Sequence, residues 1–272
     1  MPELPEVETT VRGLARVLDG RRLLRVEPRR ADLRRAIPID LGQRLTGARV
    51  TGLSRRAKYG LIDTDRGDTL VFHLGMSGRW RIDPEEIGAH DHLLIDTDDG
   101  HRLSLNDPRR FGSLDLVATA RLADWPTFAA LGPEPLGPDL TGARLKDELA
   151  GRSAAVKLLL LDQRIVAGLG NIYVCEALFR ARIDPRKAGG RVGAAKLDAL
   201  AGAIQDVLRD AIEAGGSSLR DFARPDGELG YFSKQFDVYG REGEPCSEGC
   251  AGTVKRIVQG GRSTFYCPSC QR

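Results

Sequence analysis

The chain is divided by the stretch Leu131-Gly132-Pro133-Glu134-Pro135-Leu136-Gly137-Pro138. Proline lacks the backbone N–H that a regular helix or strand needs, so the three prolines and two glycines of this stretch interrupt both structures. Short segments with strand character come before it, and longer segments with helical periodicity come after it. The stretch therefore predicts a linker or a domain edge in a multidomain protein of the α+β class.

The part before this stretch is predicted to be rich in β-structure. Residues 3–18 carry apolar side chains at helical spacing, from Val7 through Val11 to Leu14 and Leu18, and Asp19-Gly20 ends that helix. Seven segments of strand character follow, separated by turns: 23–26, 49–53, 60–63, 69–74, 92–96, 102–105 and 113–117. We expect a domain over residues 1–131 in which two packed sheets carry the first helix.

The part after the stretch is predicted to be helical. Helices are expected over residues 154–163, 171–181 and 194–214, and Asn171 favours the N-cap position of the second. Residues 217–235 form a long polar segment without periodicity, which is typical of a functional loop. We expect a linker over residues 132–150 and a helical domain over residues 151–237.

Composition and charge exclude some classes of protein and leave others open. The 272 residues are 41% hydrophobic and contain no apolar run of about 18 residues, so no membrane span is predicted. The polar, acidic N-terminus does not resemble a signal peptide, and we expect a cytoplasmic protein. The net charge of +3 does not by itself indicate nucleic-acid binding. Arginines cluster in residues 21–35, which suits a phosphate-binding groove and, equally well, an ordinary solvated face.

Four of the five cysteines form a module over residues 238–272. Cys246 and Cys250 make one close pair, and Cys267 and Cys270 make another. Two such pairs suit one tetrahedral zinc ion, and the odd cysteine count argues against a disulfide scaffold. Strand character on either side of residues 259–261 predicts a β-hairpin that needs this structural zinc to fold. A stapled chain end with no further role is the alternative, but Arg262 at the hairpin tip argues against it, because an exposed arginine on a rigid turn is well placed to bind phosphate.

The chain begins Met1-Pro2-Glu3-Leu4-Pro5-Glu6, and this end carries potential chemistry. Removal of Met1 would leave Pro2 with a secondary amine whose pKa, about 7.7–8.0 for an α-amino group, keeps part of it neutral near pH 7. Such an amine can add to an aldehyde-like carbon, and a neighbouring carboxyl such as Glu3 can transfer the proton. Taken alone, these residues are explained more simply as the start of a helix.

Two glycine-containing turns carry exposed side chains of an unusual kind. His73-Leu74-Gly75-Met76-Ser77-Gly78 presents a methionine, and Asn106-Asp107-Pro108-Arg109-Arg110-Phe111-Gly112 presents cations and an aromatic ring. Apolar side chains of this kind can separate stacked bases, while arginine can bind the base left behind. For Met76, the alternative is a side chain that fills the core. Lys58 lies just before a predicted strand, and a single lysine at such a position is usually a plain surface charge.

Taken together, these segments resemble formamidopyrimidine-DNA glycosylase from end to end. The resemblance rests on the first nine residues, on both turns, and on the segments Arg56-Ala57-Lys58-Tyr59, Gly168-Leu169-Gly170-Asn171-Ile172-Tyr173 and 261–271. Leu4 favours this branch, because the related endonuclease VIII group has glycine there. The three-residue gap between Cys246 and Cys250 departs from the usual two and bears on the local hairpin geometry.

The resemblance implies a fold and a set of roles. The fold is an N-terminal β-sandwich with a helix, a helix-two-turn-helix domain and a C-terminal zinc β-hairpin. The implied catalytic residues are Pro2 as Schiff-base nucleophile, Glu3 as proton donor, and Lys58 and Arg262 as phosphate contacts that assist elimination. The implied DNA contacts are His73, Met76, His90, Arg109, Phe111, Arg152 and Asn171. A lesion loop from Ser217 to about Gly227, with Ser218 and Arg220, would close over the extruded base.

The function that follows is a bifunctional glycosylase and lyase acting on oxidised purines in double-stranded DNA. It would be a monomer with one structural Zn²⁺ per chain, held by Cys246, Cys250, Cys267 and Cys270, in the bacterial cytoplasm and associated with the nucleoid. One alternative is a zinc-hairpin protein that binds damaged or kinked DNA without chemistry. A nearer alternative is a preference for oxidised pyrimidines, as in the endonuclease VIII group.

Overall fold

The computed structural model describes residues 2–217, 225 and 232–272 and divides into two compact units. Unit 1 comprises residues 1–129 and 214–231, and unit 2 comprises residues 130–213 and 232–272. Among the described residues, no helix is both long and apolar enough to cross a bilayer.

Unit 1 contains two four-stranded antiparallel sheets that share one core. The first has the strand order β1-β6-β7-β5 and the second the order β2-β3-β4-β8. Phe72 and Trp80 come from different sheets, and their rings pack edge to face with centroids 5.5 Å apart. The strand bounds are β1 (Leu23–Pro28), β2 (Val50–Arg56), β3 (Tyr59–Thr64), β4 (Asp68–His73), β5 (Arg79–Ile82), β6 (Asp91–Thr97), β7 (Arg102–Asn106) and β8 (Ser113–Ala118). The predicted β-sandwich is confirmed, and β5 is a strand that the sequence did not predict.

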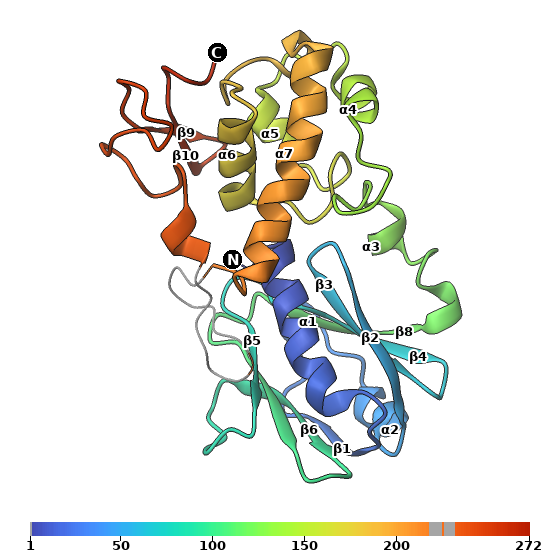
Figure 1. The fold of residues 1–272 in the computed structure, drawn as a ribbon. Helices are drawn as coiled ribbons and strands as arrows, with labels where there is room; N and C mark the ends of the chain where they lie inside the picture. The colour runs from blue at the N-terminus through green and yellow to red at the C-terminus, as the bar shows by residue number, and fades with distance from the viewer. Residues whose placement is uncertain (1, 218–224, 226–231) are drawn as a thin grey trace. The chain divides into compact units, whose positions relative to one another are not determined.

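The first helix, α1 (Leu4–Leu18), lies along this sandwich (Figure 1). Its predicted apolar stripe of Val7, Val11, Leu14 and Leu18 is buried in the shared core. The helix begins with Pro5 in its first turn, where the missing N–H has no helical partner to lose. Two short helices were not predicted, namely α2 (Leu41–Leu45) and α3 (Pro126–Ala129).

Unit 2 is built around the long helix α7 (Ala194–Glu213), on which α4 (Gly142–Leu149) and α6 (Asn171–Arg180) pack (Figure 1). The helix α4 lies inside the segment 132–150 that was expected to be a linker; it buries Leu145 and Leu149. The predicted helix over 154–163 is shortened to α5 (Val156–Leu160), because Ala155 instead makes an isolated β-bridge with Ala188. The 3-10 turns are η1 (Thr119–Arg121), η2 (Gly189–Arg191) and η3 (Phe232–Gln235).

The C-terminal hairpin of unit 2 consists of β9 (Lys255–Gln259) and β10 (Arg262–Tyr266). Gln259 pairs with Arg262 across a two-residue turn, and both turn residues, Gly260 and Gly261, have positive φ angles of 54° and 72°. Such a turn matches the right-handed twist of the strands and needs residues that tolerate positive φ. The predicted hairpin and its turn are confirmed.

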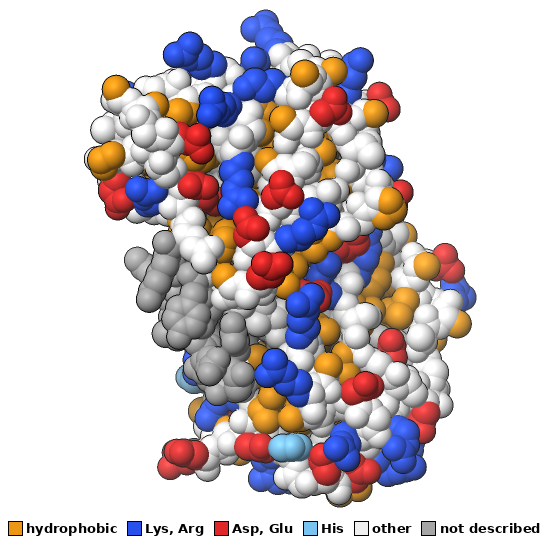
Figure 2. Space-filling model, viewed as in Figure 1, with side chains coloured by type: hydrophobic (Ala, Val, Ile, Leu, Met, Phe, Trp, Pro, Cys, Tyr) orange, Lys and Arg blue, Asp and Glu red, His pale blue; other side chains and the backbone are white. Residues whose placement is uncertain are grey.

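The arginines of residues 21–35 are largely engaged with acidic side chains of unit 1. Their ion pairs join Arg21 to Asp99, Arg25 to Glu27, Arg30 to Asp32 and Arg35 to Asp115. Figure 2 shows the same mixture more widely, with Lys and Arg side chains interspersed with Asp and Glu on the viewed face. The solvated-face interpretation of this cluster therefore describes most of it.

Candidate active site and metal centre

The N-terminal residues of unit 1 are buried. Pro2 is buried directly before α1, Glu3 is 3% exposed, and Glu6 is 2% exposed. Glu3 and Glu6 form a reciprocal capping box, in which the Glu3 backbone N–H donates to the Glu6 carboxylate at 2.8 Å. A capping box satisfies N–H groups that the first helical turn leaves without partners. The start of the chain is therefore held in one position.

Glu6 also fixes the beginning of the segment that follows α7. Its Oε1 accepts hydrogen bonds from the Ser217 backbone N–H at 2.8 Å and from the Ser217 hydroxyl at 2.9 Å. One buried carboxylate thus joins the N-terminus to the first residue of the predicted lesion loop. Ser218 and Arg220, the other predicted loop residues, lie outside the described residues.

Lys58 lies in the tight turn between β2 and β3. It is only 7% exposed, so the interpretation as a plain surface charge is wrong. Ala57 before it has a positive φ of 53°, unusual for a residue with a side chain. Arg55 holds this turn by donating to the Ala57 carbonyl at 2.8 Å and pairing with Glu8 of α1 at 3.1 Å. The Lys58 turn is therefore tied to the helix that begins beside Pro2.

His73 lies at the end of β4, with its ring 4.9 Å from that of Tyr59. Its Nδ1 accepts a hydrogen bond from the Gly75 backbone N–H at 3.0 Å. Burial, reinforced by the positive charge of Lys58, lowers the pKa of His73 from 6.5 to about 4. At neutral pH the ring is therefore uncharged and carries its proton on Nε2, where it can serve as a hydrogen-bond donor.

The two turns with exposed side chains interlock through a buried carboxylate, Asp107. Its Oδ1 accepts from the Ser77 hydroxyl at 2.6 Å, and its Oδ2 accepts from the Gly112 backbone N–H at 2.8 Å. The Ser77 oxygen in turn accepts from the Arg109 backbone N–H at 3.2 Å. Asp107 is fully buried, so both turns are built on one polar anchor.

The side chains that these turns present are exposed. Met76 is 37% exposed and Phe111 is 44% exposed, so core filling does not describe Met76. The Arg109 guanidinium lies over the Phe111 ring, with its carbon 4.9 Å from the ring centroid. Two apolar side chains and a stacked cation on rigid turns are suited to entering a base stack.

His90 lies beside this anchor. Its side chain is exposed, and its backbone carbonyl accepts from the Asp107 backbone N–H at 2.9 Å. The next residue, Asp91, is buried. Burial alone would raise the pKa of Asp91, but hydrogen bonds from Gly88, Asn106 and Ser104 hold that pKa below its usual value. The backbone at His90 is thus fixed on both sides.

The four predicted cysteine ligands come together in unit 2. Their sulfur atoms all lie within 4.8 Å of one another, with Cys246 3.7 Å from Cys270 and Cys250 3.6 Å from Cys267. Tetrahedral Zn–S bonds of about 2.3 Å place sulfur atoms about 3.8 Å apart, so the arrangement fits one zinc ion. The extra residue between Cys246 and Cys250 is absorbed in a turn where Gly249 has a positive φ of 66°. Four thiolates leave no open position for water, so the zinc is structural.

The hairpin tip is seated on the helices of unit 2, whereas the Arg262 side chain is exposed. Asn171 lies in the first turn of α6, and Gly170 takes the N-cap position, so the prediction of an Asn171 cap is wrong. The Asn171 amide instead donates to the Ser263 carbonyl at 2.8 Å and to the Tyr239 hydroxyl at 3.3 Å. Asn171 thus contacts the residue next to Arg262.

A second buried carboxylate, Glu176 of α6, holds the chain that leads into the cysteine module. It accepts backbone N–H bonds from Asp237 at 2.8 Å, Val238 at 3.1 Å and Tyr239 at 2.8 Å. Burial raises the pKa of Glu176, and these three donors oppose that effect. The approach to the metal centre is therefore fixed to the same helix as Asn171.

Arg152 borders a hollow of about 420 Å³ on unit 2. The hollow is lined by Gly151, Arg152, Ser153, Ala188, Gly190 and Arg191. Its two guanidinium groups give it a positive character that suits a phosphate. The Arg152 Nε donates to the Glu148 carbonyl at 2.7 Å, which directs the side chain.

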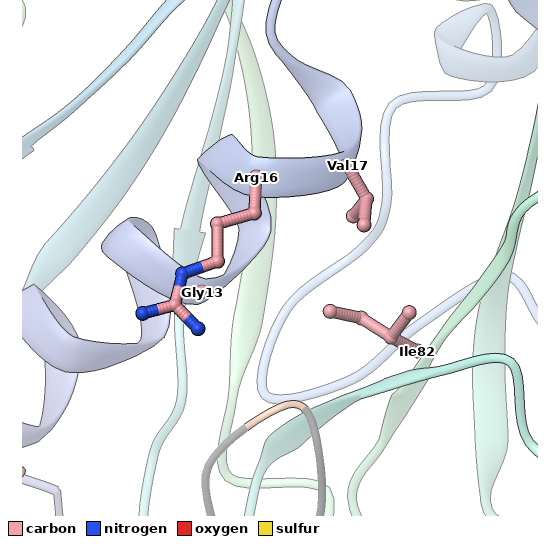
Figure 3. Close-up of a pocket in the computed structure, with 4 residues that line it drawn as sticks. All are labelled: Gly13, Arg16, Val17 and Ile82. Atoms are coloured by element: carbon pink, nitrogen blue, oxygen red, sulfur yellow. The ribbon is translucent and has the colours of Figure 1, made fainter.

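A separate hollow of about 330 Å³ lies between α1 and β5 in unit 1, with Arg16, Val17 and Ile82 on its walls (Figure 3). Its described lining includes none of the predicted site residues. Pro225 closes against the same two elements, since its carbonyl accepts from the Ile82 N–H at 3.0 Å and its ring lies next to Gly13. The hollow therefore lies beside the place where Pro225 packs on α1 and β5, apart from the N-terminal site.

Sequence reasoning did not single out several residues that organise these sites. They are Ser77, Asp91, Asp107, Lys157 and Glu176, and they are all buried. A buried polar residue in an apolar segment, such as Lys157 within Val156–Leu160, is the one sequence signal that could have pointed to them.

Comparison with known proteins gives concordant matches along the chain. Three family models match: the formamidopyrimidine-DNA glycosylase N-terminal domain over residues 1–114, its H2TH domain over residues 131–223, and the zinc finger found in FPG and IleRS over residues 243–272. A formamidopyrimidine-DNA glycosylase of Novosphingobium aromaticivorans is 71% identical over 272 residues, with 100% of both chains covered.

Solved structures of similar proteins include DNA complexes. One is a complex of a Lactococcus lactis FPG mutant with Fapy-dG containing DNA, at 33% identity and a TM-score of 0.92 over 100% of both chains. Another is the wild-type Lactococcus lactis Fpg (MutM) with DNA containing an oxidised pyrimidine, at 33% identity and a TM-score of 0.91 over 100% of both chains.

Proposed function

The chain belongs to the formamidopyrimidine-DNA glycosylase family, and from this premise we propose that it removes oxidised purines from duplex DNA and then cleaves the strand through Pro2. It is a DNA glycosylase of base-excision repair, with a zinc finger and a DNA partner. The observation that carries the mechanism is the buried Pro2-Glu3 end, capped on α1 and tied through Glu8 and Arg55 to the Lys58 turn.

Pro2 is the proposed nucleophile. Once Met1 is removed, its nitrogen attacks C1′ of the damaged nucleotide, the glycosidic bond breaks, and the base leaves with the bonding electrons and a proton. The C1′–O4′ bond then breaks and O4′ takes a proton, so the sugar ring opens and the amine is left as a charged iminium at C1′, which withdraws electrons from the sugar. An α-amino group has a pKa of about 7.7–8.0, so part of this amine is neutral and nucleophilic near pH 7.

Glu3 is the proposed proton donor. It is 3% exposed and lies next to Pro2 in the chain, within the buried start of unit 1. Its backbone is fixed by the hydrogen bond to Glu6, so its carboxyl has a defined position relative to Pro2. Proton transfer from a positioned carboxyl contributes typically 10²–10⁴-fold to a rate.

Lys58 and Arg262 are the proposed phosphate contacts for strand cleavage. In β-elimination, a proton leaves C2′ and the C3′–O3′ bond breaks; in δ-elimination, a proton leaves C4′ and the C5′–O5′ bond breaks. Each step expels a phosphate, whose negative charge a nearby cation stabilises. Lys58 serves the first step and Arg262 the second.

The two turns supply the means to reach the base. A stacked base cannot present its glycosidic carbon to an amine, and extruding it costs a few kcal/mol. Met76 and Phe111 would fill the vacated space, and Arg109 would bind the base left opposite. His73, His90, Arg152 and Asn171 would contact the flanking DNA, and the loop beginning at Ser217 would close over the extruded base.

The proposal is tested by measuring base release from three duplexes, which contain 8-oxoguanine, an oxidised pyrimidine or no lesion. We expect free 8-oxoguanine and strand cleavage, with the oxidised purine released faster than the pyrimidine in direct competition. Faster release of the oxidised pyrimidine would show that oxidised pyrimidines, and not oxidised purines, are the preferred substrates. Tight binding to abasic DNA without any cleavage would favour the non-catalytic zinc-hairpin alternative.

We further propose that the protein works as a monomer on the bacterial nucleoid, because the proposed nucleophile, wedge and metal centre all come from one chain. Light scattering of the protein bound to a short lesion duplex should give one chain per duplex. A fluorescent fusion should follow the DNA stain in cells, and exclusion from that stain would contradict nucleoid association.

A further inference from the structure

Lys157 is a lysine with no exposed surface, in the short helix α5. Burying an ammonium group is unfavourable unless hydrogen bonds replace the lost water. Its Nζ donates to the Thr264 hydroxyl at 2.7 Å and to the Ser263 carbonyl at 3.2 Å. These acceptors belong to the two residues that directly follow Arg262.

The Ser263 carbonyl receives a second donor from another helix. The Asn171 amide of α6 reaches it at 2.8 Å, so α5 and α6 hold the same backbone oxygen. Thr264, the other acceptor of Lys157, is fully buried. The opposite strand is held less directly, by the Gln259 amide on the Pro185 carbonyl at 3.3 Å. The beginning of β10 is thus fixed to the helices of unit 2 at the two residues that follow Arg262.

We infer that Lys157 is a positioning residue for Arg262, and this inference rests on the proposed function. An exposed arginine has a long, flexible side chain, so its charge can be aimed only if its backbone is fixed. The Lys157 and Asn171 contacts fix that backbone one residue away from Arg262. Lys157 therefore acts on the step that Arg262 serves, the breaking of the C5′–O5′ bond after loss of the C4′ proton, without touching the DNA itself.

The test uses the full-length, zinc-loaded protein and a 5′-labelled duplex with one 8-oxoguanine. Lys157→Met keeps an unbranched side chain as far as the ε position and removes the ammonium group. We expect the δ-elimination step to slow about 10- to 100-fold, as for a misplaced catalytic group, so that the β-elimination product accumulates. Base release and borohydride trapping at Pro2 should stay within about twofold of wild type. Lys146→Met, at an exposed position in α4, is the matched control and should leave the product ratio unchanged.

A double-mutant comparison distinguishes a specific effect on the position of Arg262 from a general loss of structure. If Lys157 acts through Arg262, then Lys157→Met combined with Arg262→Gln should be no slower in δ-elimination than Arg262→Gln alone. Zinc content and the melting temperature check that each variant is folded. Thr264→Val removes one hydrogen-bond acceptor of Lys157 and should shift the product ratio in the same direction. If Lys157→Met fails to bind zinc, the product ratio of Thr264→Val tests the inference in its place.

Three outcomes overturn the inference: an unchanged product ratio in a folded Lys157→Met protein, an equal loss in trapping and in δ-elimination, or losses that multiply in the double variant. Failure of the proposed function looks different, because the wild-type protein itself would then release no base and cleave no strand.

Discussion

At the scale of single residues, burial and hydrogen bonding together decide which groups carry charge. His73 is neutral because its ring is largely removed from water and lies near positive charges, including Lys58. Asp91 and Asp107 are buried among donors that suit a carboxylate. The candidate site thus contains a neutral donor, whose state is set by its surroundings, and fixed acceptors within one framework.

The lowered pKa of His73 predicts a pH dependence of stability. The unfolded chain binds a proton at His73 near pH 6.5, whereas the folded protein does so only near pH 4. The contribution is therefore complete above about pH 6.5 and is lost progressively as the pH falls to about 4. A shift of this size corresponds to at most about 3 kcal/mol.

The measurement is urea unfolding of wild type and His73→Asn between pH 4 and 7. The asparagine oxygen can still accept from the Gly75 N–H, so the variant removes mainly the titration. Wild type should lose more free energy of unfolding than the variant as the pH falls. Equal losses in the two proteins would show that His73 titrates normally.

At the scale of elements, the turn that carries Met76 and the turn that carries Phe111, here called the wedge turns, depend on a close approach between their backbones. Gly75 has a φ of 61°, and a Cβ there would lie 2.3 Å from the Phe111 carbonyl carbon and 2.5 Å from the Gly112 nitrogen. Both turns would have to separate to admit any side chain. The turns that carry the exposed Met76 and Phe111 touch because Gly75 has no Cβ and because Asp107 accepts hydrogen bonds from both turns.

Gly75→Ala is therefore expected to destabilise the protein by about 2–4 kcal/mol, through steric overlap and an unfavourable φ together. Gly20→Ala is the control, because Gly20 has a similar φ of 72° and open space around it. It should lose only about 1 kcal/mol. Urea unfolding compares the two, and a similar loss in both variants would mean that the turns separate easily.

The zinc hairpin gives a second prediction at this scale. Cys267→Ser should abolish zinc binding and strand cleavage, because the hairpin has too small a core to fold without metal. Cys175→Ala is the control; Cys175 lies outside the four-sulfur cluster and should leave one zinc per chain. Elemental analysis and a cleavage assay measure both effects. A folded, active Cys267→Ser protein without zinc would contradict a structural role for the metal.

Helices and strands were predictable from the sequence where the residues that specify them lie close together in the chain. The apolar stripe of α1 and the glycine turn of the hairpin are signals within a few residues, and both elements formed as predicted. Strand β5 was missed because four residues between a glycine turn and Asp83-Pro84 give too short an alternation. The Lys157–Thr264 and Glu6–Ser217 contacts could not be read from local patterns, because their partners lie 107 and 211 residues apart.

At the scale of the whole molecule, the proposed reaction draws on both units. Unit 1 supplies Pro2, Glu3, Lys58 and the wedge turns, while unit 2 supplies Arg262 and the metal centre. The motifs predicted this set of residues because each carries its own chemistry. The anchors that position them, such as Asp107 and Lys157, became identifiable only when burial was known.

The most direct test of the account is to locate the covalent bond to DNA. The protein is reduced with borohydride in the presence of 8-oxoguanine duplex, its intact mass is measured, and the adduct is mapped after trypsin digestion. We predict an adduct on the N-terminal tryptic peptide, residues 2–12, attached at the Pro2 nitrogen, and none in Pro2→Gly. An adduct on Lys58 or another lysine, or full cleavage by protein that retains Met1, would contradict the central claim.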